Sequence, residues 1–177
     1  VKEDTTLYAV WSQNSYPVVF KNYDGEILQN TDVLYGEMPE YEGADPETEA
    51  DVKYTYVFRG WNKPFEAVAG PQVYEAVYDG YLNSYNVQFV NYDGEILHEG
   101  LMEYGMVPVY GGDTPEKAAD AQYTYTFAGW DKKFEEVTGN AVYTATYKST
   151  LRTYEVKFVN YDGTELYKVT DLYGTKL

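Results

Sequence analysis

Two runs of oxygen-bearing side chains are the first candidates for chemistry in this sequence. They alternate around a glycine and comprise Asn22, Asp24 and Glu26 in one run and Asn91, Asp93 and Glu95 in the other. An EF-hand calcium loop opens with such a spacing, but its downstream glutamate and its remaining ligand positions are missing here. We therefore favour a plain Asp-Gly hairpin turn, and we expect neither a metal nor a cofactor.

Exposed aromatic residues are the second candidates, because a flat ring can stack on a sugar. Trp61 and Trp130 each follow a glycine at the end of a predicted strand, and Tyr23 and Tyr92 belong to the Asp-Gly turns. The alternative for the tryptophans is core packing, which we favour. The predicted core aromatics are Phe58, Trp61, Phe127 and Trp130. For the two tyrosines, which lie opposite the apolar face of the strand, binding stays open.

No set of residues points to catalysis. His98 is the single histidine, its equivalents one repeat away are Gln29 and Tyr167, and the chain has no cysteine. A catalytic histidine needs an oriented partner and a nucleophile, so we interpret His98 as a solvent-facing strand residue. We predict that the protein is not an enzyme and has no catalytic residues.

The composition is acidic and rich in tyrosine. The net charge is −16, and 22 of the 177 residues are tyrosine. Residues 16–84 hold 13 acidic and 4 basic side chains, a net charge of −9, whereas residues 85–153 hold 10 and 5, a net charge of −5. Such a surface repels phosphate backbones and anionic lipids, so we expect no nucleic-acid partner. No apolar run approaches the ~20 residues of a membrane span, and we expect no membrane insertion.

The sequence is a tandem array with a period of 69 residues. An aromatic-led strand ending in Asn-Tyr-Asp-Gly occurs three times, at residues 16–25, 85–94 and 154–163. A fixed period of this size indicates that each copy is one structural unit. The predicted organisation is a closing strand of a preceding repeat at 1–15, complete repeats at 16–84 and 85–153, and the opening half of a following repeat at 154–177.

Each repeat is predicted to fold in the order β-β-α-β-β. In the second repeat the strands are expected near 85–89, 95–104, 123–127 and 141–147, from their period-two alternation. An acid before a proline at 113–120, matched by Asp45-Pro46-Glu47, predicts a short helix between the strand pairs. We therefore expect an α+β class with small β-grasp-like (ubiquitin-like), β-rich repeats. A wholly β unit is the alternative.

The repeated motifs resemble the Listeria–Bacteroides repeat family, which includes the B-repeat of internalin B. They are the opening Tyr-x-Val-x-Phe-x-Asn-Tyr-Asp-Gly, the Tyr-Gly step, and the strands through Phe58-Arg59-Gly60-Trp61 and Phe127-Ala128-Gly129-Trp130, with closures at Tyr74 and Tyr143. The resemblance implies a β-grasp module of large surface proteins, mostly of Gram-positive bacteria. The segments Pro39–Pro46 and Pro108–Pro115 are insertions relative to that family. The family has no catalytic or cofactor residues to carry over.

The functional expectation is a non-catalytic stalk or spacer in an adhesin-type protein, outside the cell and attached to its surface or wall. The alternative is a multivalent array that binds host protein or glycan, with repetition supplying avidity. The expected partners are neighbouring repeats of the same chain. Residues 1–11 and 154–177 match complementary parts of one repeat, so we also expect head-to-tail self-association of the chain at high concentration.

Overall fold

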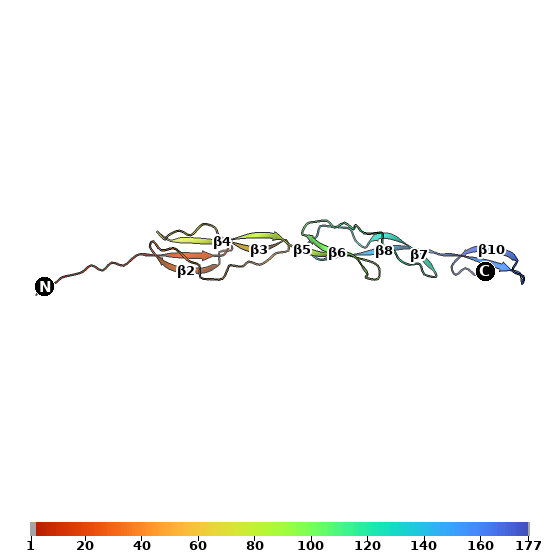
Figure 1. The fold of residues 1–177 in the computed structure, drawn as a ribbon, viewed down its shortest axis with the longest axis horizontal. Helices are drawn as coiled ribbons and strands as arrows, with labels where there is room; N and C mark the ends of the chain where they lie inside the picture. The colour runs from red at the N-terminus through yellow and green to blue at the C-terminus, as the bar shows by residue number, and fades with distance from the viewer. Residues whose placement is uncertain (1–2, 177) are drawn as a thin grey trace. The chain divides into compact units, whose positions relative to one another are not determined.

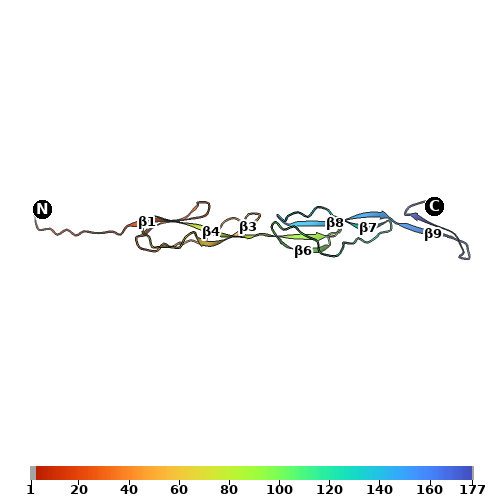
Figure 2. The ribbon, with the colours of Figure 1, turned by 90° about the horizontal axis from the view of Figure 1, so that it is seen from above.

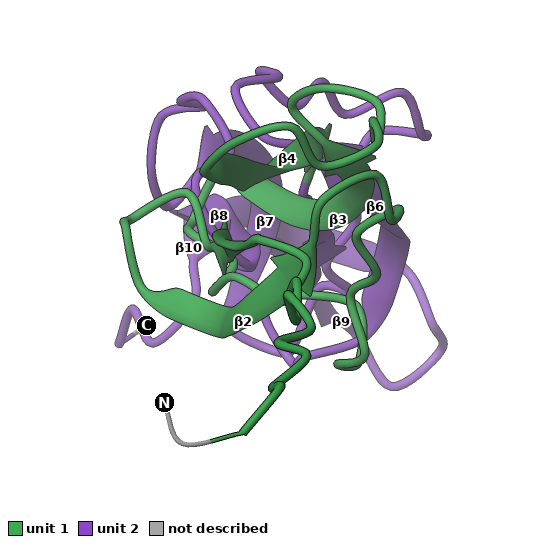
Figure 3. Cartoon of the chain, turned by 90° about the vertical axis from the view of Figure 1, so that its left-hand side faces the viewer, with its two compact units in different colours: residues 1–82 green, residues 83–177 purple. Residues whose placement is uncertain are grey.

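The fold is built from β-strands alone. The computed structural model describes residues 3–176, which divide into two compact units at Leu82 and Asn83 (Figures 1 and 3). The strands are β1 (Ser15–Lys21), β2 (Ile27–Leu34), β3 (Tyr54–Trp61), β4 (Gln72–Leu82), β5 (Ser84–Val90), β6 (Ile96–Glu103), β7 (Tyr123–Trp130), β8 (Ala141–Leu151), β9 (Thr153–Val159) and β10 (Glu165–Leu172). Before β1, the described residues 3–14 form no strand and run as an extended segment (Figure 2).

One long strand organises each repeat. The first sheet has the order β2-β1-β4-β3, and the second has the order β6-β5-β8-β7. The first half of β4 pairs in parallel with β1, from Val18 opposite Gln72 to Lys21 opposite Glu75. Its second half pairs antiparallel with β3, out to Tyr54 opposite Leu82. Because β8 pairs with β5 and β7 in the same registers, the two repeats share one topology.

Each repeat has its own core at the parallel pair. In the first repeat Val18, Phe20, Val68 and Tyr74 are buried, and Phe20 stacks on Tyr74 with 5.1 Å between ring centroids. The second core contains the equivalent residues Val87, Phe89, Val137 and Tyr143. The predicted core aromatics are half-buried instead: Trp61 and Trp130 pack at the core margin, and Phe58 and Phe127 contact them edge to face.

The predicted α+β class was wrong, because the described residues contain no helix and the β-grasp order therefore fails. The segments at 45–47 and 113–120 lie in the irregular connections between β2 and β3 (residues 35–53) and between β6 and β7 (residues 104–122). We call these connections the straps. In the first repeat Pro39 and Pro46 are buried, and the Tyr41 ring between them lies 5.2 Å from Phe20 and 5.0 Å from Trp61. A helix of two turns is marginal by itself, so tertiary anchoring of an extended strap prevails.

Each strap includes one of the segments interpreted above as insertions, Pro39–Pro46 or Pro108–Pro115. Carbonyls of the straps accept hydrogen bonds from asparagines of the hairpin turns: Asn22 Nδ2 donates to the carbonyl of Glu47 at 3.1 Å, and Asn91 Nδ2 donates to that of Glu116 at 3.0 Å. A helical carbonyl would accept from an amide four residues later. The strap thus packs on the sheet in the place where a helix was predicted.

The third Asn-Tyr-Asp-Gly copy forms the two-stranded sheet β9-β10. Its Phe158 is 44% exposed, whereas the equivalent Phe20 and Phe89 are 0% and 2% exposed. The hairpin is bonded to the second repeat: Tyr154 donates its hydroxyl to the carbonyl of Ala121 at 2.6 Å, and the Arg152 amide donates to that of Gln122 at 2.9 Å.

Candidate functional site: a tyrosine cage beside the hairpin turn

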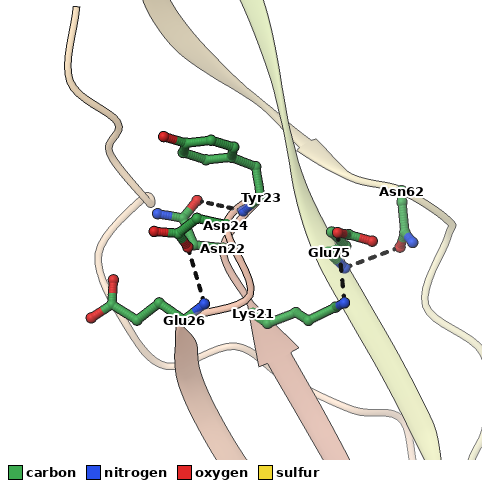
Figure 4. Close-up of polar contacts among 7 residues, drawn as sticks. All are labelled: Lys21, Asn22, Tyr23, Asp24, Glu26, Asn62 and Glu75. Carbon is green, nitrogen blue, oxygen red and sulfur yellow. Dashed lines mark hydrogen bonds and ion pairs between the residues drawn. The ribbon is translucent and has the colours of Figure 1, made fainter.

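The Asn-Tyr-Asp-Gly segment forms the hairpin turn predicted for it. Gly25 has a φ of 92°, and its amide donates to the carbonyl of Asn22 at 3.0 Å. The Asp24 carboxylate accepts from the Glu26 amide at 3.0 Å (Figure 4). Asn22 is buried, and its Oδ1 accepts from the Tyr23 amide at 2.9 Å. Two of the three candidate calcium ligands in this turn, Asn22 and Asp24, therefore use a side-chain oxygen to accept from the chain's own backbone.

The buried asparagine also ties the turn to the long strand. The Tyr78 hydroxyl donates to Asn22 Oδ1 at 2.6 Å, and the Tyr147 hydroxyl donates to Asn91 Oδ1 at the same distance. Burial raises the pKa of both phenols, which keeps each hydroxyl protonated as a donor. The turn is thus fixed relative to the sheet, and Tyr23 or Tyr92 is fixed with it.

The remaining sequence candidates are scattered. Within residues 3–176 no group of three His, Cys, Asp or Glu side chains could hold a metal ion. His98 is exposed on β6 opposite Phe89. Because Trp61 and Trp130 are engaged in packing, the tyrosines of the turns are the aromatic candidates that remain at an open surface.

A groove of about 720 Å³ opens beside Tyr23 in the first repeat. Its walls include the rings of Tyr23, Tyr56 and Tyr78 and the carboxylates of Glu49, Asp51 and Glu75. Tyr23 is 58% exposed and meets Tyr78 edge to face, with 6.0 Å between ring centroids. We call the pair Tyr23 and Tyr56, with Asp51 beside them, the first cage.

Hydrogen bonds hold the acidic side of the first cage in place. Asp51 Oδ1 accepts from the Tyr54 amide at 2.6 Å, and Asp51 Oδ2 accepts from the Tyr56 hydroxyl at 2.9 Å. Hydrogen bonds from backbone amides, above all that of Tyr54, lower the pKa of the Asp51 carboxyl. The hydrogen bond to this carboxylate in turn raises the pKa of Tyr56. Asp51 is therefore an anion at neutral pH and orients the Tyr56 ring.

The second repeat holds the same cage with a cation inside. Its rings are Tyr92 and Tyr125, and the Tyr125 hydroxyl donates to Asp120 Oδ2 at 2.7 Å. The Lys117 ammonium lies 4.4 Å from the centroid of Tyr92 and 4.1 Å from that of Tyr125. Both distances are within the range of a cation–π contact. Position 48, one period before Lys117, is threonine, so the first cage has no such ammonium from its own strap.

Sequence reasoning singled out Tyr23 and Tyr92 but missed the other members of the cage. The cage combines residues from three places in the chain, which in the first repeat are Tyr23 of the turn, Thr48 of the strap and Tyr56 of β3. No local spacing in the sequence brings them together. An alignment of the two repeats does contain a signal. Tyrosine is kept at 56 and 125 and aspartate at 51 and 120, whereas threonine at 48 aligns with lysine at 117.

No family model matches the chain. It is 28% identical over 195 aligned residues to a protein of Evansella cellulosilytica that bears the name Gly-rich membrane protein. That alignment covers 98% of this chain and 22% of the relative, so the chain spans about a fifth of its length. The described part of this chain contains no helix that could cross a lipid bilayer.

Two solved structures are similar in part. One is a pair of streptococcal high identity repeats in tandem, domains 3–4 of a cell surface protein, with a TM-score of 0.37 and 14% identity over 77% of this chain and 99% of that one. The other is Mub-RV, with a TM-score of 0.20 and 15% identity over 77% of this chain and 98% of that one.

Proposed function

We propose that this chain is a non-catalytic spacer region of a bacterial cell-surface protein of the adhesin type. The observation that carries the proposal is the strand register within one repeat. Ser15 begins β1 three positions before Val18, which lies opposite Gln72, and β4 continues ten positions beyond Gln72 to Leu82. Since β1 and β4 are parallel, the chain enters at one end of the repeat and leaves at the other.

The register gives each repeat a definite span. Thirteen strand positions separate the levels of Ser15 and Leu82, which corresponds to roughly 40 Å at the rise of a β-strand. The second repeat has the same register from Ser84 to Leu151. A fold that moves the chain forward by its full length per repeat suits a spacer, because each added copy adds reach.

The connection after the second repeat also suits a spacer. β8 ends at Leu151 and β9 begins at Thr153, so one residue separates the two strands. Arg152 Nη1 donates to the carbonyl of Asp120 at 2.7 Å, and its carbonyl accepts from the Tyr173 amide at 2.9 Å. A hydrogen-bonded connection of this kind restricts the hinge motion that a Gly/Ser linker would allow.

The surface location and the attachment to a cell wall belong to the same proposal. The repeated motifs resemble repeats of Gram-positive surface proteins, and the acidic surface keeps an exposed array soluble. One of the similar solved structures bears the name of tandem repeats from a cell surface protein, and the Evansella relative bears the name of a membrane protein. The spacer proposal itself rests on the register and the repetition.

Two measurements test the spacer. Because the chain has no cysteine, spin labels at Ser84→Cys and Leu151→Cys report one distance without background. We expect a narrow distribution near roughly 40 Å, set by the strand rise. In the parent protein on cells, in-frame deletion of residues 85–153 should shorten the reach of the distal part while surface display is kept. A broad distance distribution, or unchanged reach after deletion, would contradict the spacer.

The alternative is an array that binds host protein or glycan. The observation in its favour is that the turn tyrosine stays exposed in all three copies, with Tyr23 58%, Tyr92 46% and Tyr161 98% exposed. A spacer does not need these rings. Replacing all three with alanine should leave reach unchanged under the spacer proposal, and should abolish adhesion of cells if the array is the function.

A further inference from the structure

We propose that the first cage, formed by Tyr23, Tyr56 and Asp51, binds a lysine side chain of a partner polypeptide. The second repeat supplies the template, since the same residue types there enclose the chain's own Lys117 between two ring faces. The first repeat keeps the rings and the carboxylate but has Thr48 at the position of the lysine. The rings and the aspartate of the cage are thus the same in both repeats, the strap residue at 48 and 117 differs, and the surrounding groove differs further.

The charged residues around the two cages are not the same. The groove of the first repeat is lined by the carboxylates of Glu49, Asp51 and Glu75. Their equivalents in the second repeat are Ala118, Asp120 and Thr144, and there Asp131 replaces Asn62. The groove of the first repeat thus has three carboxylates, of which Glu75 pairs with Lys21 and Asp51 feels the charge of Lys53, whereas the second site has two carboxylates and the Lys117 ammonium. The ammonium over the cage rings comes from Lys117 in the second repeat, and its position in the first repeat is threonine. Ring faces and carboxylates both attract a cation.

Each of the four basic residues of the first repeat already has a contact within the chain. They are Lys21, which pairs with Glu75 at 3.6 Å, Lys53 over the Tyr54 ring at 5.0 Å, Arg59 with Asp79 at 3.7 Å, and Lys63 over the Tyr74 ring at 4.7 Å. The pair of Lys21 with Glu75 offsets one of the three carboxylates of the groove. Asp51 accepts hydrogen bonds from the Tyr54 amide and the Tyr56 hydroxyl and feels the charge of Lys53, and Glu49 adds a further negative charge to the groove wall.

The shape of the groove favours a side chain of a polypeptide as the occupant. An ammonium between two rings fills only a small part of about 720 Å³. The rest can take the four-carbon stem of a lysine and the backbone beside it. A divalent metal ion is a poorer match, since it prefers a shell of oxygen ligands and two tyrosines line this cage. The net charge of −16 adds long-range attraction for a basic partner.

The test is a titration of the whole chain, followed by backbone amide chemical shifts. The probe is a short capped peptide with one lysine, and the matched control is the same peptide with an Nε-acetylated lysine. We expect saturable shifts at residues 48–51 and 75–78 and none at 117–120. Acetylation should weaken binding about tenfold or more, because it removes the charge that the rings attract.

A reciprocal pair of variants makes the test specific. Thr48→Lys should place an ammonium in the first cage and abolish the shifts, whereas Thr48→Ser, the matched control, should keep them. Lys117→Thr should open the second cage, so that new shifts arise at residues 117–120. Equal binding of the acetylated peptide, retained binding by Thr48→Lys, shifts spread over the whole acidic surface, or no saturable shift at all would each overturn the proposal.

Discussion

The two repeats are equivalent in their cores and different at their cages. Phe20 and Phe89 each stack on a tyrosine of the long strand, at 5.1 Å and 5.2 Å. The cages share the two rings and the aspartate, yet only the second encloses a strap lysine. The comparison teaches that the two repeats keep the same packing while the strap residue beside the cage rings changes, from threonine in the first repeat to lysine in the second.

Truncating the central aromatic ring tests the equivalence of the cores with the largest effect. Phe20→Ala and Phe89→Ala should each lower the free energy of unfolding by about 3–5 kcal/mol, as large-to-small substitutions of buried aromatics do. Urea unfolding measures the loss, and native-state hydrogen exchange of β1 and β5 amides locates it. If the smaller loss of unfolding free energy is less than half of the larger one, the cores are not equivalent.

Removing the buried asparagine should have the next largest effect. Asn22→Ala and Asn91→Ala each leave a half-buried tyrosine hydroxyl without its acceptor, at a cost of about 1–3 kcal/mol. Asp24→Ala and Asp93→Ala, which change exposed residues of the same turns, are the controls and should cost less. A loss no greater than in these controls would mean that the asparagine does not fix the turn.

Acidification tests whether both cages use an ionised aspartate. The folded-state pKa of Asp51 and of Asp120 is lowered from the ordinary value of 3.8, so each carboxylate stabilises the fold above that value. This stability is lost as the pH falls through the lower folded pKa. Asp51→Asn and Asp120→Asn should therefore flatten the acid limb of unfolding free energy against pH. If the free energy of unfolding falls equally steeply with acid in wild type and variants, the ionised aspartates do not stabilise the fold.

The smallest effect is that of the cage lysine itself. Lys117→Thr should lower the free energy of unfolding by about 0.5–1 kcal/mol, the size of an exposed cation–π contact. Thr48→Lys should raise that of the first repeat by a similar amount. Chemical denaturation of both variants, with Lys117→Gln as a control for stem packing, measures the difference. A Lys117→Gln variant as stable as wild type would show that the ammonium contributes nothing.

Most of the strand pattern could be predicted from the sequence. Alternation places Val87 and Phe89 on one face, and the Asp-Gly pair fixes the turn at Gly94, whose φ is 89°. The partner of that strand could not be predicted, because alternation defines a face and not a neighbour. The parallel pairing of Val87 with Ala141 joins residues far apart in the chain and leaves no local signal.

The straps and the cages were beyond local rules for a related reason. Asp113-Thr114-Pro115 has the features of a helix start, but buried prolines and the Tyr110 ring, 5.1 Å from Phe89, hold the segment in another conformation. Val68 and Val137, buried in loops, were likewise absent from the predicted core. In each case the tertiary contact outweighs the local preference.

The parallel pairing of β1 with β4 determines how a repeat would respond to a pulling force. Tension applied at Ser15 and Leu82 would draw the two strands past each other along their own axes, because the chain enters and leaves at opposite ends. The hydrogen bonds between Val18–Lys21 and Gln72–Glu75 would then be sheared together rather than peeled apart one by one. Each repeat is thus arranged to yield abruptly at a high force, with its aromatic core directly behind the bonds that must break.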